Sequence, residues 1–152
     1  MNVEYINPFT QATFDVLSMF GTFDPKLEKP ALAGEALSSE GIAVVVGIIG
    51  EVKGQVVYTY SEDTAKAIAS TMMMGMPVET FDEMAKSAVS ELANMISGNA
   101  STAIAAKGFA IDIAPPTLIA GENVKITSNI KKNLIVPVIT TVGVIKIFIS
   151  LE

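Results

Sequence analysis

A glutamate and an asparagine three residues apart, Glu91 and Asn94, are the side chains of this sequence whose types and spacing best suit chemistry. Residues three apart in a helix are neighbours, so the carboxylate and the amide would stand together on one face. The carboxylate can accept a charge-assisted hydrogen bond, and the amide can both donate and accept hydrogen bonds. Ser87, Ser90 and Gly98 surround the pair without a bulky side chain. The pair therefore projects from a flat surface that another protein could approach closely.

A long helix over residues 82–107 is the element that must position this pair. Asp82 can cap its start, and acidic Glu83 suits the first turn, where the helix dipole favours a negative charge. Lys107 falls in the last turn, and Gly108 can adopt the left-handed conformation that ends many helices. Such a helix is about 39 Å long.

The helical period divides this segment into an apolar face and a polar face. The face expected to join the core consists of Ala85, Ala88, Val89, Leu92, Ile96, Ala100 and Ala103. The face expected to be exposed consists of Ser87, Ser90, Glu91, Asn94, Ser97, Gly98 and Ser101.

The Glu-x-x-Asn spacing is a weak signal by itself, because residue frequencies predict a chance match in roughly one chain of this length in two or three. The sequence holds a second match, Glu4 and Asn7. Asn7 precedes Pro8, which disfavours helical geometry, so we expect that this second pair does not share a helical face. For Glu91 and Asn94 the alternative is two solvated residues on a polar helix face, and the residues alone favour that alternative.

Two further helices are predicted, one on each side of an extended region. Pro8 suits the first turn of a helix within residues 1–20, which Gly21 ends. Ser61 caps a helix over residues 62–74. Its methionines favour adaptable packing in the core or an interface over a ligand role.

The other segments are predicted to be strands or extended connections. The apolar run 41–49 is typical of a strand buried on both faces, residues 50–54 suit a hairpin, and residues 55–60 return. Residues 23–34 hold two prolines and form a loop or an edge strand, and Pro115–Pro116 make residues 109–119 extended and poor in donors. Later strands are predicted over residues 124–130, 134–140 and 144–150. This order predicts an α+β fold with a largely antiparallel sheet and helices packed against it.

The composition excludes several kinds of chemistry. The chain has no Cys, His, Trp or Arg, so it lacks the usual zinc ligands, a thiol nucleophile, a histidine base and an arginine finger. We expect no metal site of its own. The net charge of −6 argues against nucleic-acid binding, which needs a basic surface.

Length and hydropathy suggest a single domain over residues 1–152. Half of the residues are hydrophobic and the mean hydropathy is +0.49, which suggests an apolar interface in addition to a core. No signal peptide is visible, and the apolar tail from Leu134 to Leu151 suits strands better than a membrane helix, because it is β-branched and contains Pro137 and Gly143. We expect a cytoplasmic protein that does not bind membranes.

The run SAVSELANMISGNA, from Ser87 to Ala100, resembles the signature helix of the CheC/CheX/FliY phosphatases of bacterial chemotaxis. Their pattern is Asp or Ser, three residues, Glu, two residues, Asn, and a proline a little over twenty residues later. Ser87, Glu91 and Asn94 match it, and Pro115–Pro116 lie in the expected region. Residues 46–50, 54–58, 72–76 and 115–121 are also similar to CheX members. CheC members carry two copies of the motif, and FliY members have an extra N-terminal segment, so the CheX branch fits best.

The resemblance implies a phosphatase that removes phosphate from the aspartyl phosphate of a CheY-type response regulator. The phosphoryl group, its Mg²⁺ and a lysine would all belong to the partner, so the phosphatase needs no cofactor of its own. Asn94 would position the attacking water, Glu91 would contact the partner's lysine, and Ser87, Ser90 and Gly98 would support the interface. The resemblance, together with the apolar excess, also implies a homodimer formed by sheet or strand association.

Two alternatives remain open at this stage. The same helix could bind a receiver domain or a flagellar switch component without catalysis, and turnover would distinguish that module from a phosphatase. A small-molecule-binding α+β domain is the weaker alternative, because no glycine-rich phosphate loop is present.

Overall fold

Strand β3 (Ala36–Gly50) is the central element of the fold, because other strands pair with it along both edges. Val44, for example, lies opposite Tyr58 on one side and Leu118 on the other. Its apolar run is buried on the face toward the helices, as the sequence predicted, but on the opposite face Val45 is half-buried and Ile49 is 57% exposed. Ile42 and Val44 face the main core, and Ala43 belongs to a smaller cluster on the opposite face of the sheet.

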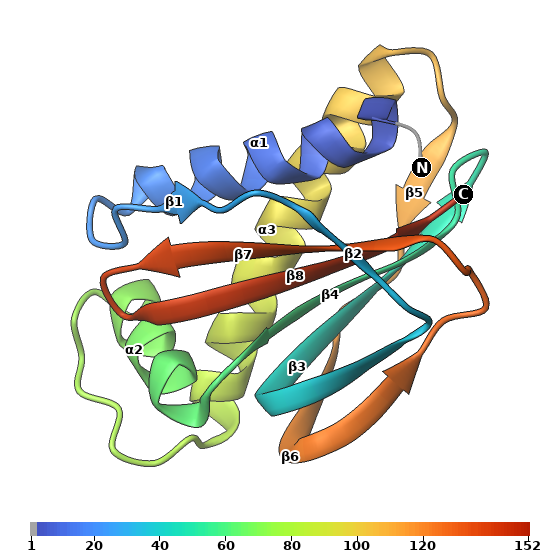
Figure 1. Ribbon diagram of the computed structural model, residues 1–152. Helices are drawn as coiled ribbons and strands as arrows, with labels where there is room; N and C mark the ends of the chain where they lie inside the picture. Colours follow the sequence, from blue (N-terminus) through green and yellow to red (C-terminus); the bar gives the residue numbers. More distant parts are fainter. Residues whose placement is uncertain (1–2) are drawn as a thin grey trace.

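The computed structural model describes residues 3–152, and within them the chain forms three helices and one antiparallel sheet of eight strands (Figure 1). The strands follow the order β1-β7-β8-β4-β3-β5, with β2 also paired to β7 and β6 also paired to β3. The helices are α1 (Val3–Met19), α2 (Glu62–Met72) and α3 (Glu83–Ala106). The remaining strands are β1 (Lys26–Leu27), β2 (Ala31–Ala33), β4 (Gly54–Tyr60), β5 (Ile111–Ile113), β6 (Thr117–Thr127), β7 (Asn133–Thr140) and β8 (Gly143–Leu151). The predicted α+β class is confirmed.

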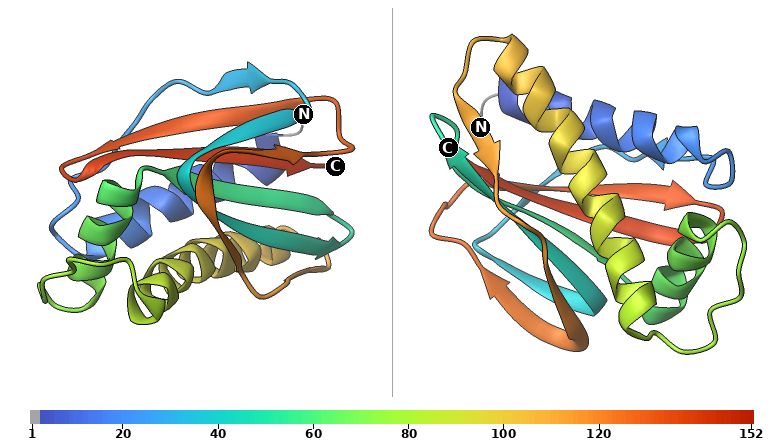
Figure 2. Two further views of the ribbon diagram at one scale, coloured as in Figure 1. Left: turned by 90° about the horizontal axis from the view of Figure 1, so that it is seen from below. Right: turned by 180° about the vertical axis from the view of Figure 1, so that it is seen from behind.

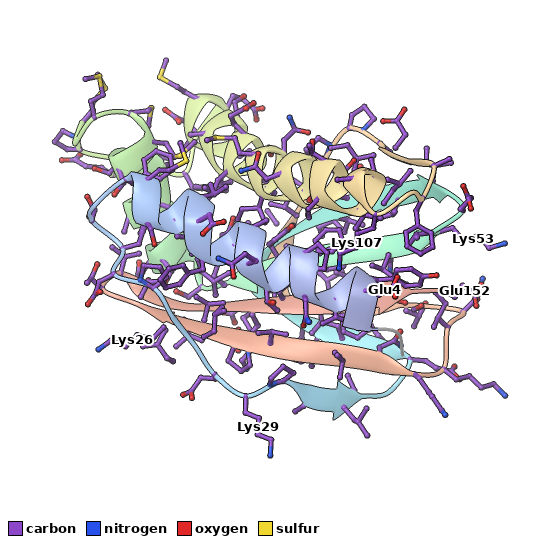
Figure 3. The ribbon with its side chains drawn as sticks, turned by 90° about the horizontal axis from the view of Figure 1, so that it is seen from above. Glu4, Lys26, Lys29, Lys53, Lys107 and Glu152 are labelled. Atoms are coloured by element: carbon purple, nitrogen blue, oxygen red, sulfur yellow. The ribbon has the colours of Figure 1, made fainter. Side chains whose placement is uncertain are left out.

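The helices cover one face of the sheet and leave the other face without a helix (Figure 2). The main core lies between the helices and the sheet and contains most of the buried apolar side chains. The opposite face holds the smaller cluster, centred on Phe148, Val57 and Ala43. Charged side chains stay outside both clusters. Lys26 and Lys29 lie near the β1 edge and project into solvent (Figure 3).

The predicted ends of α2 and α3 are largely confirmed. The Asp82 carboxylate accepts the backbone N–H of Ala85 at 2.9 Å, and the Ser61 hydroxyl accepts that of Thr64 at 3.1 Å. These caps satisfy N–H groups that the first turn of a helix leaves unpaired. Helix α2 ends at Met72 rather than residue 74, because Met74 adopts a left-handed backbone conformation with φ of 60°.

Helix α1 differs from the prediction at its start. It begins at Val3, so Pro8 lies inside the helix and not in its first turn, and the preceding residue Asn7 is helical. Proline itself has a helical φ, and its interior cost comes from the lost hydrogen bond and a clash with the carbonyl four residues earlier. That carbonyl belongs to exposed Glu4 in the first turn, while Ile6 is buried in the core. Burial of this end of the helix thus overrides the local preference.

Strand β6 also departs from the prediction. It runs from Thr117 to Thr127, whereas the sequence indicated a strand only over residues 124–130. Gly121 and Asn123 have positive φ angles and suggest a turn, yet the strand continues because β3 pairs with both halves of it. A register shift between Ser38 and Glu40 of β3 accommodates the irregularity.

Helix α3 is attached to the sheet by a buried polar contact that the sequence did not predict. Ser97 is 0% exposed, and its hydroxyl lies 2.8 Å from that of Tyr58 in β4. The expectation that Ser97 lies on the exposed face was therefore wrong, and Ala103, expected in the core, is exposed. Burial raises the pKa of Tyr58 well above its ordinary value, against a smaller opposing effect of the Ser97 hydrogen bond. The Tyr58 hydroxyl therefore stays protonated and keeps its hydrogen bond.

We expect Ser97→Ala to lower the free energy of unfolding by about 1–3 kcal/mol, because it leaves the buried Tyr58 hydroxyl without a partner. Tyr58→Phe should also destabilise the protein, and the double variant should be more stable than the sum of the two effects predicts. Urea unfolding of the four proteins measures this coupling. Strict additivity would mean that the two hydroxyls do not interact.

Candidate functional site

An open groove of about 440 Å³ runs between the polar face of α3 and the segment that joins β5 to β6. Ser87, Ser90, Glu91 and Asn94 line one side, and residues 113–116 line the other. Four of the five residues singled out as catalytic or partner-binding thus share one surface, because they lie within two turns of one helix.

Glu91 and Asn94 have unused hydrogen-bonding capacity in this groove. Glu91 is exposed and Asn94 is half-buried. Within residues 3–152, neither side chain forms a hydrogen bond or an ion pair with another residue. The nearby lysine of α3, Lys86, instead contacts Glu83 at 3.3 Å. A carboxylate and an amide side by side are therefore available to an incoming molecule.

The opposite wall of the groove is held by the sheet. Ala114 donates its backbone N–H to the carbonyl of Gly47 in β3 at 2.8 Å, which fixes the chain just before Pro115 and Pro116. Neither proline has an N–H to donate, and the ladder is interrupted between β5 and β6 as the sequence predicted. A continuous strand is absent there, so this segment leaves the polar face of α3 open.

Gly98 lies one turn after Asn94 and outside the groove lining. A Cβ atom added to Gly98 would have no atom within 4 Å outside its own helix turn and its neighbours. Packing within the chain therefore does not require glycine here, although glycine in a helix interior costs about 1 kcal/mol relative to alanine.

The second Glu-x-x-Asn match lies on another helix. Glu4 and Asn7 are both exposed and three residues apart on α1, so the expectation that they do not share a helical face was wrong. The two copies differ in setting, because Glu4 belongs to the first turn of its helix whereas Glu91 lies in the third turn of α3. Neither Glu4 nor Asn7 lines the groove beside α3.

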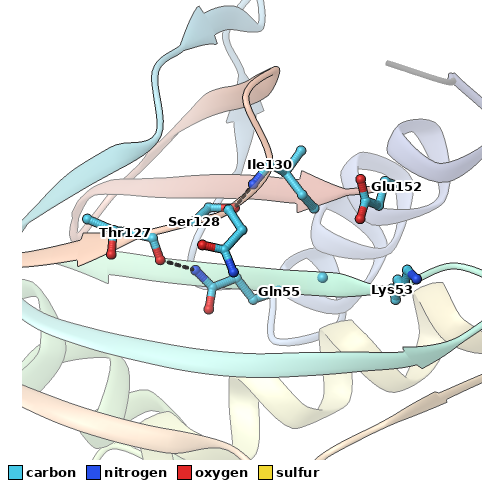
Figure 4. A pocket seen from close by; sticks show the side chains of 8 residues that line it. Lys53, Gln55, Thr127, Ser128, Ile130 and Glu152 are labelled. Carbon is cyan, nitrogen blue, oxygen red and sulfur yellow. Dashed lines mark hydrogen bonds between the residues drawn. The ribbon is translucent and has the colours of Figure 1, made fainter.

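Another hollow, of about 360 Å³, lies at the end of the sheet near the C-terminal residue (Figure 4). Some of its polar groups are engaged with one another. Gln55 donates to the carbonyl of Thr127, Ser128 accepts the backbone N–H of Ile130, and the hydroxyls of Ser128 and Ser150 are in contact. A carboxylate and an amide, those of Glu152 and Asn129, also line this hollow, but they come from different segments of the chain. Glu91 and Asn94 are held together on one face of a long helix, so the α3 groove is the candidate site.

Residues 3–152 contain no group of three or more acidic side chains placed to bind a metal ion. No helix among them is long and apolar enough to cross a membrane.

Known proteins resemble this chain over most of its length. A curated relative from Thermotoga maritima, named CheY-P phosphatase CheX, is 31% identical over 128 residues, which cover 84% of this chain and 83% of that protein. The chemotaxis protein CheX of Desulfovibrio desulfuricans matches in structure with a TM-score of 0.86 and 29% identity, over 98% of this chain and 99% of that one. A CheX from Borrelia burgdorferi, solved in complex with CheY, BeF₃ and Mg²⁺, matches with a TM-score of 0.83 and 32% identity, over 99% of each chain.

The sequence family described as chemotaxis phosphatase CheX matches residues 42–140, a range that contains the Glu91 and Asn94 pair and both prolines of the opposite wall. With this match and the similarity to CheX proteins over almost the whole chain, the protein belongs to the CheX family of chemotaxis phosphatases.

Proposed function

We propose that this protein hydrolyses the aspartyl phosphate of a phosphorylated CheY-type response regulator. The observation that carries the proposal is the free carboxylate and amide of Glu91 and Asn94, side by side on an accessible helix face. Support also comes from the family, and from the relative solved with CheY, BeF₃ and Mg²⁺. Because the substrate is a folded protein, an open surface suits this reaction better than a closed pocket.

In the proposed reaction the receiver domain supplies the mixed anhydride of its aspartate and the Mg²⁺ that neutralises the phosphoryl oxygens. The role of Asn94 is to hold a water molecule in line with the phosphorus–oxygen bond that breaks. Its amide oxygen accepts a hydrogen bond from the water, and its amide nitrogen can donate one, so a single side chain fixes the water's orientation. Water attacks phosphorus, the aspartate carboxylate leaves, and inorganic phosphate is released. Positioning of this kind can supply most of the catalysis in phosphoryl transfer.

Glu91 has a different role in this proposal. Its exposed carboxylate forms a charge-assisted contact with a lysine of the receiver, which fixes the register of docking and brings Asn94 to the phosphoryl group. Ser87, Ser90 and Gly98 surround this contact with small side chains, and Gly98 has open space where a Cβ would stand. A partner's backbone can therefore approach the helix closely.

We expect Asn94→Ala to lower kcat by about 10²–10³-fold while the affinity for the receiver changes little, because the amide acts mainly in the transition state. Phosphate release from phosphorylated CheY with Mg²⁺ and catalytic amounts of the protein measures this. Asn99→Ala is the matched control, since Asn99 is an exposed asparagine of α3 outside the groove. If wild type binds the receiver without accelerating release, the protein is a docking module and the proposed activity is wrong.

Glu91→Gln keeps the shape of the side chain and removes its charge. We expect KM to rise by about 10–100-fold, because hydrogen bonds to charged groups contribute about 1.5–3 kcal/mol. KM of wild type should also rise with salt more steeply than KM of the variant. Glu62→Gln on α2 provides the control. Unchanged KM and salt dependence in Glu91→Gln would remove the docking role.

We also propose that the protein is a cytoplasmic homodimer that associates through its sheet. In the described chain β6 pairs with β3 along one edge, which leaves its other edge open over eleven residues. The opposite side of the sheet ends in the short strands β1 and β2, flanked by Pro25 and Pro30, which hinder pairing. We expect sedimentation at micromolar concentration to give a dimer, and a folded monomer there would contradict the proposal.

A further inference from the structure

The loop between α2 and α3 and the start of α3 carry exposed methionines. Met74 is 97% exposed, Met84 64% and Met76 58%. The sulfur atoms, yellow in Figure 3, gather at the end of the molecule where α2 and the start of α3 lie. Single exposed apolar residues are ordinary, but several together on one surface mark an interaction site.

Met84 lies on the same face of α3 as the proposed catalytic pair. It precedes Glu91 by seven residues, which is two turns with an angular offset of about 20°, and Ser87 lies between them. The distance along the helix axis from Met84 to Glu91 is about 10.5 Å. The apolar side chain is thus continuous with the polar docking face.

Met84 and Met76 both line a shallow hollow of about 350 Å³ beside the first turn of α3. Partly buried Met73 and Val78 form its apolar floor, since both also pack against the main core. Glu79 adds a carboxylate to its lining. Thr80 and Asp82 add further polar groups, so the hollow combines apolar and polar side chains, as protein interfaces do.

The size of a protein–protein contact connects this hollow with the groove. A stable interface covers about 800 Å² on each partner, which corresponds to a disc of roughly 16 Å radius. A footprint of that size centred on Glu91 extends past Met84. In the groove itself only the wall of residues 113–116 is apolar, and the α3 wall is polar. The methionines therefore add apolar area on the α3 side of the contact, beyond the polar pair.

We propose that Met84 and Met76 are the apolar anchor of the receiver-docking surface and contact an apolar patch on the same receiver domain whose phosphoaspartate lies at Asn94. This inference rests on the proposed function and adds the residues that hold the substrate protein. Methionine is unbranched and polarisable, so it adapts to partner surfaces of different shape. The anchor thus fixes the receiver at a second point about two turns from Glu91, which prevents rotation about the Glu91 contact.

The double variant Met84→Ser/Met76→Ser tests the anchor. We expect KM for phosphorylated CheY to rise about tenfold with kcat within twofold of wild type, because the anchor binds substrate and transition state equally. Calorimetry with CheY activated by beryllium fluoride and Mg²⁺ should show the same loss of affinity without turnover. Met19→Ser is the matched control, since Met19 is 70% exposed at the end of α1.

Methyl resonances of ¹³C-methionine-labelled protein give a readout that needs no substitution. The chain has eight methionines, so the spectrum is simple to assign. We expect the Met84 and Met76 signals to shift on addition of activated CheY and the Met19 signal to stay unchanged. Unperturbed Met84 and Met76 signals, or an unchanged KM in the double variant, would overturn the anchor while leaving the Asn94 chemistry intact.

Two other outcomes also overturn the inference. If the double variant changes the sedimentation coefficient and not the affinity for CheY, the methionines bind a second copy of this chain. If wild type neither binds nor dephosphorylates CheY, the proposed function fails together with the anchor. The Asn94→Ala assay separates these cases, because it reports on the chemistry alone.

Discussion

The packing of α3 against the sheet is the constraint on which the rest of the structure depends. Ala85, Val89, Leu92 and Ile96 pack into the main core, and Ser97 reaches the Tyr58 hydroxyl of β4 at 2.8 Å. The apolar contacts are not directional, but the hydrogen bond is, so it fixes the rotation of the helix about its axis. With the Ser97 hydroxyl turned toward the core, Glu91, which lies about 120° away around the helix axis, points outward.

The groove exists because two distant parts of the chain are each fixed to the same strand. Tyr58 lies opposite Val44 of β3, and Ala114 bonds to Gly47 of β3, so both walls take their positions from one rigid element. Pro115 and Pro116, directly after Ala114, have no N–H to donate, so the ladder with β3 is interrupted there. The open space beside Asn94 is therefore built in by the backbone and does not depend on the conformation of a flexible loop.

Local rules predicted the parts of this site that depend on neighbours in sequence. The cap at Asp82, the shared face of Glu91 and Asn94 and the interruption at the prolines all follow from helix geometry or backbone chemistry. Ser97 was assigned to the surface because the helical period places it beside the polar face, and only its tertiary neighbour Tyr58 explains its burial. The prediction that Pro8 lies in the first turn of its helix was wrong for a similar reason. The local preference of Asn7 against helical geometry is weaker than the stabilisation that comes from burying this end of the helix. The position of Pro115 and Pro116 opposite α3 could not be predicted from the sequence, because it depends on how distant segments pack together.

The absence of His, Cys and Arg from the sequence is consistent with a protein whose substrate brings the reactive groups. A receiver domain carries its own acyl phosphate and metal, so what the proposed reaction lacks is an oriented water and a fixed partner. Orientation needs a rigid support more than a reactive side chain, and a 24-residue helix held at both its caps and its centre is such a support. In the proposed reaction the buried Ser97 contact and the half-buried Asn94 amide act together, because a helix free to rotate would hold the water at varying angles to the phosphorus.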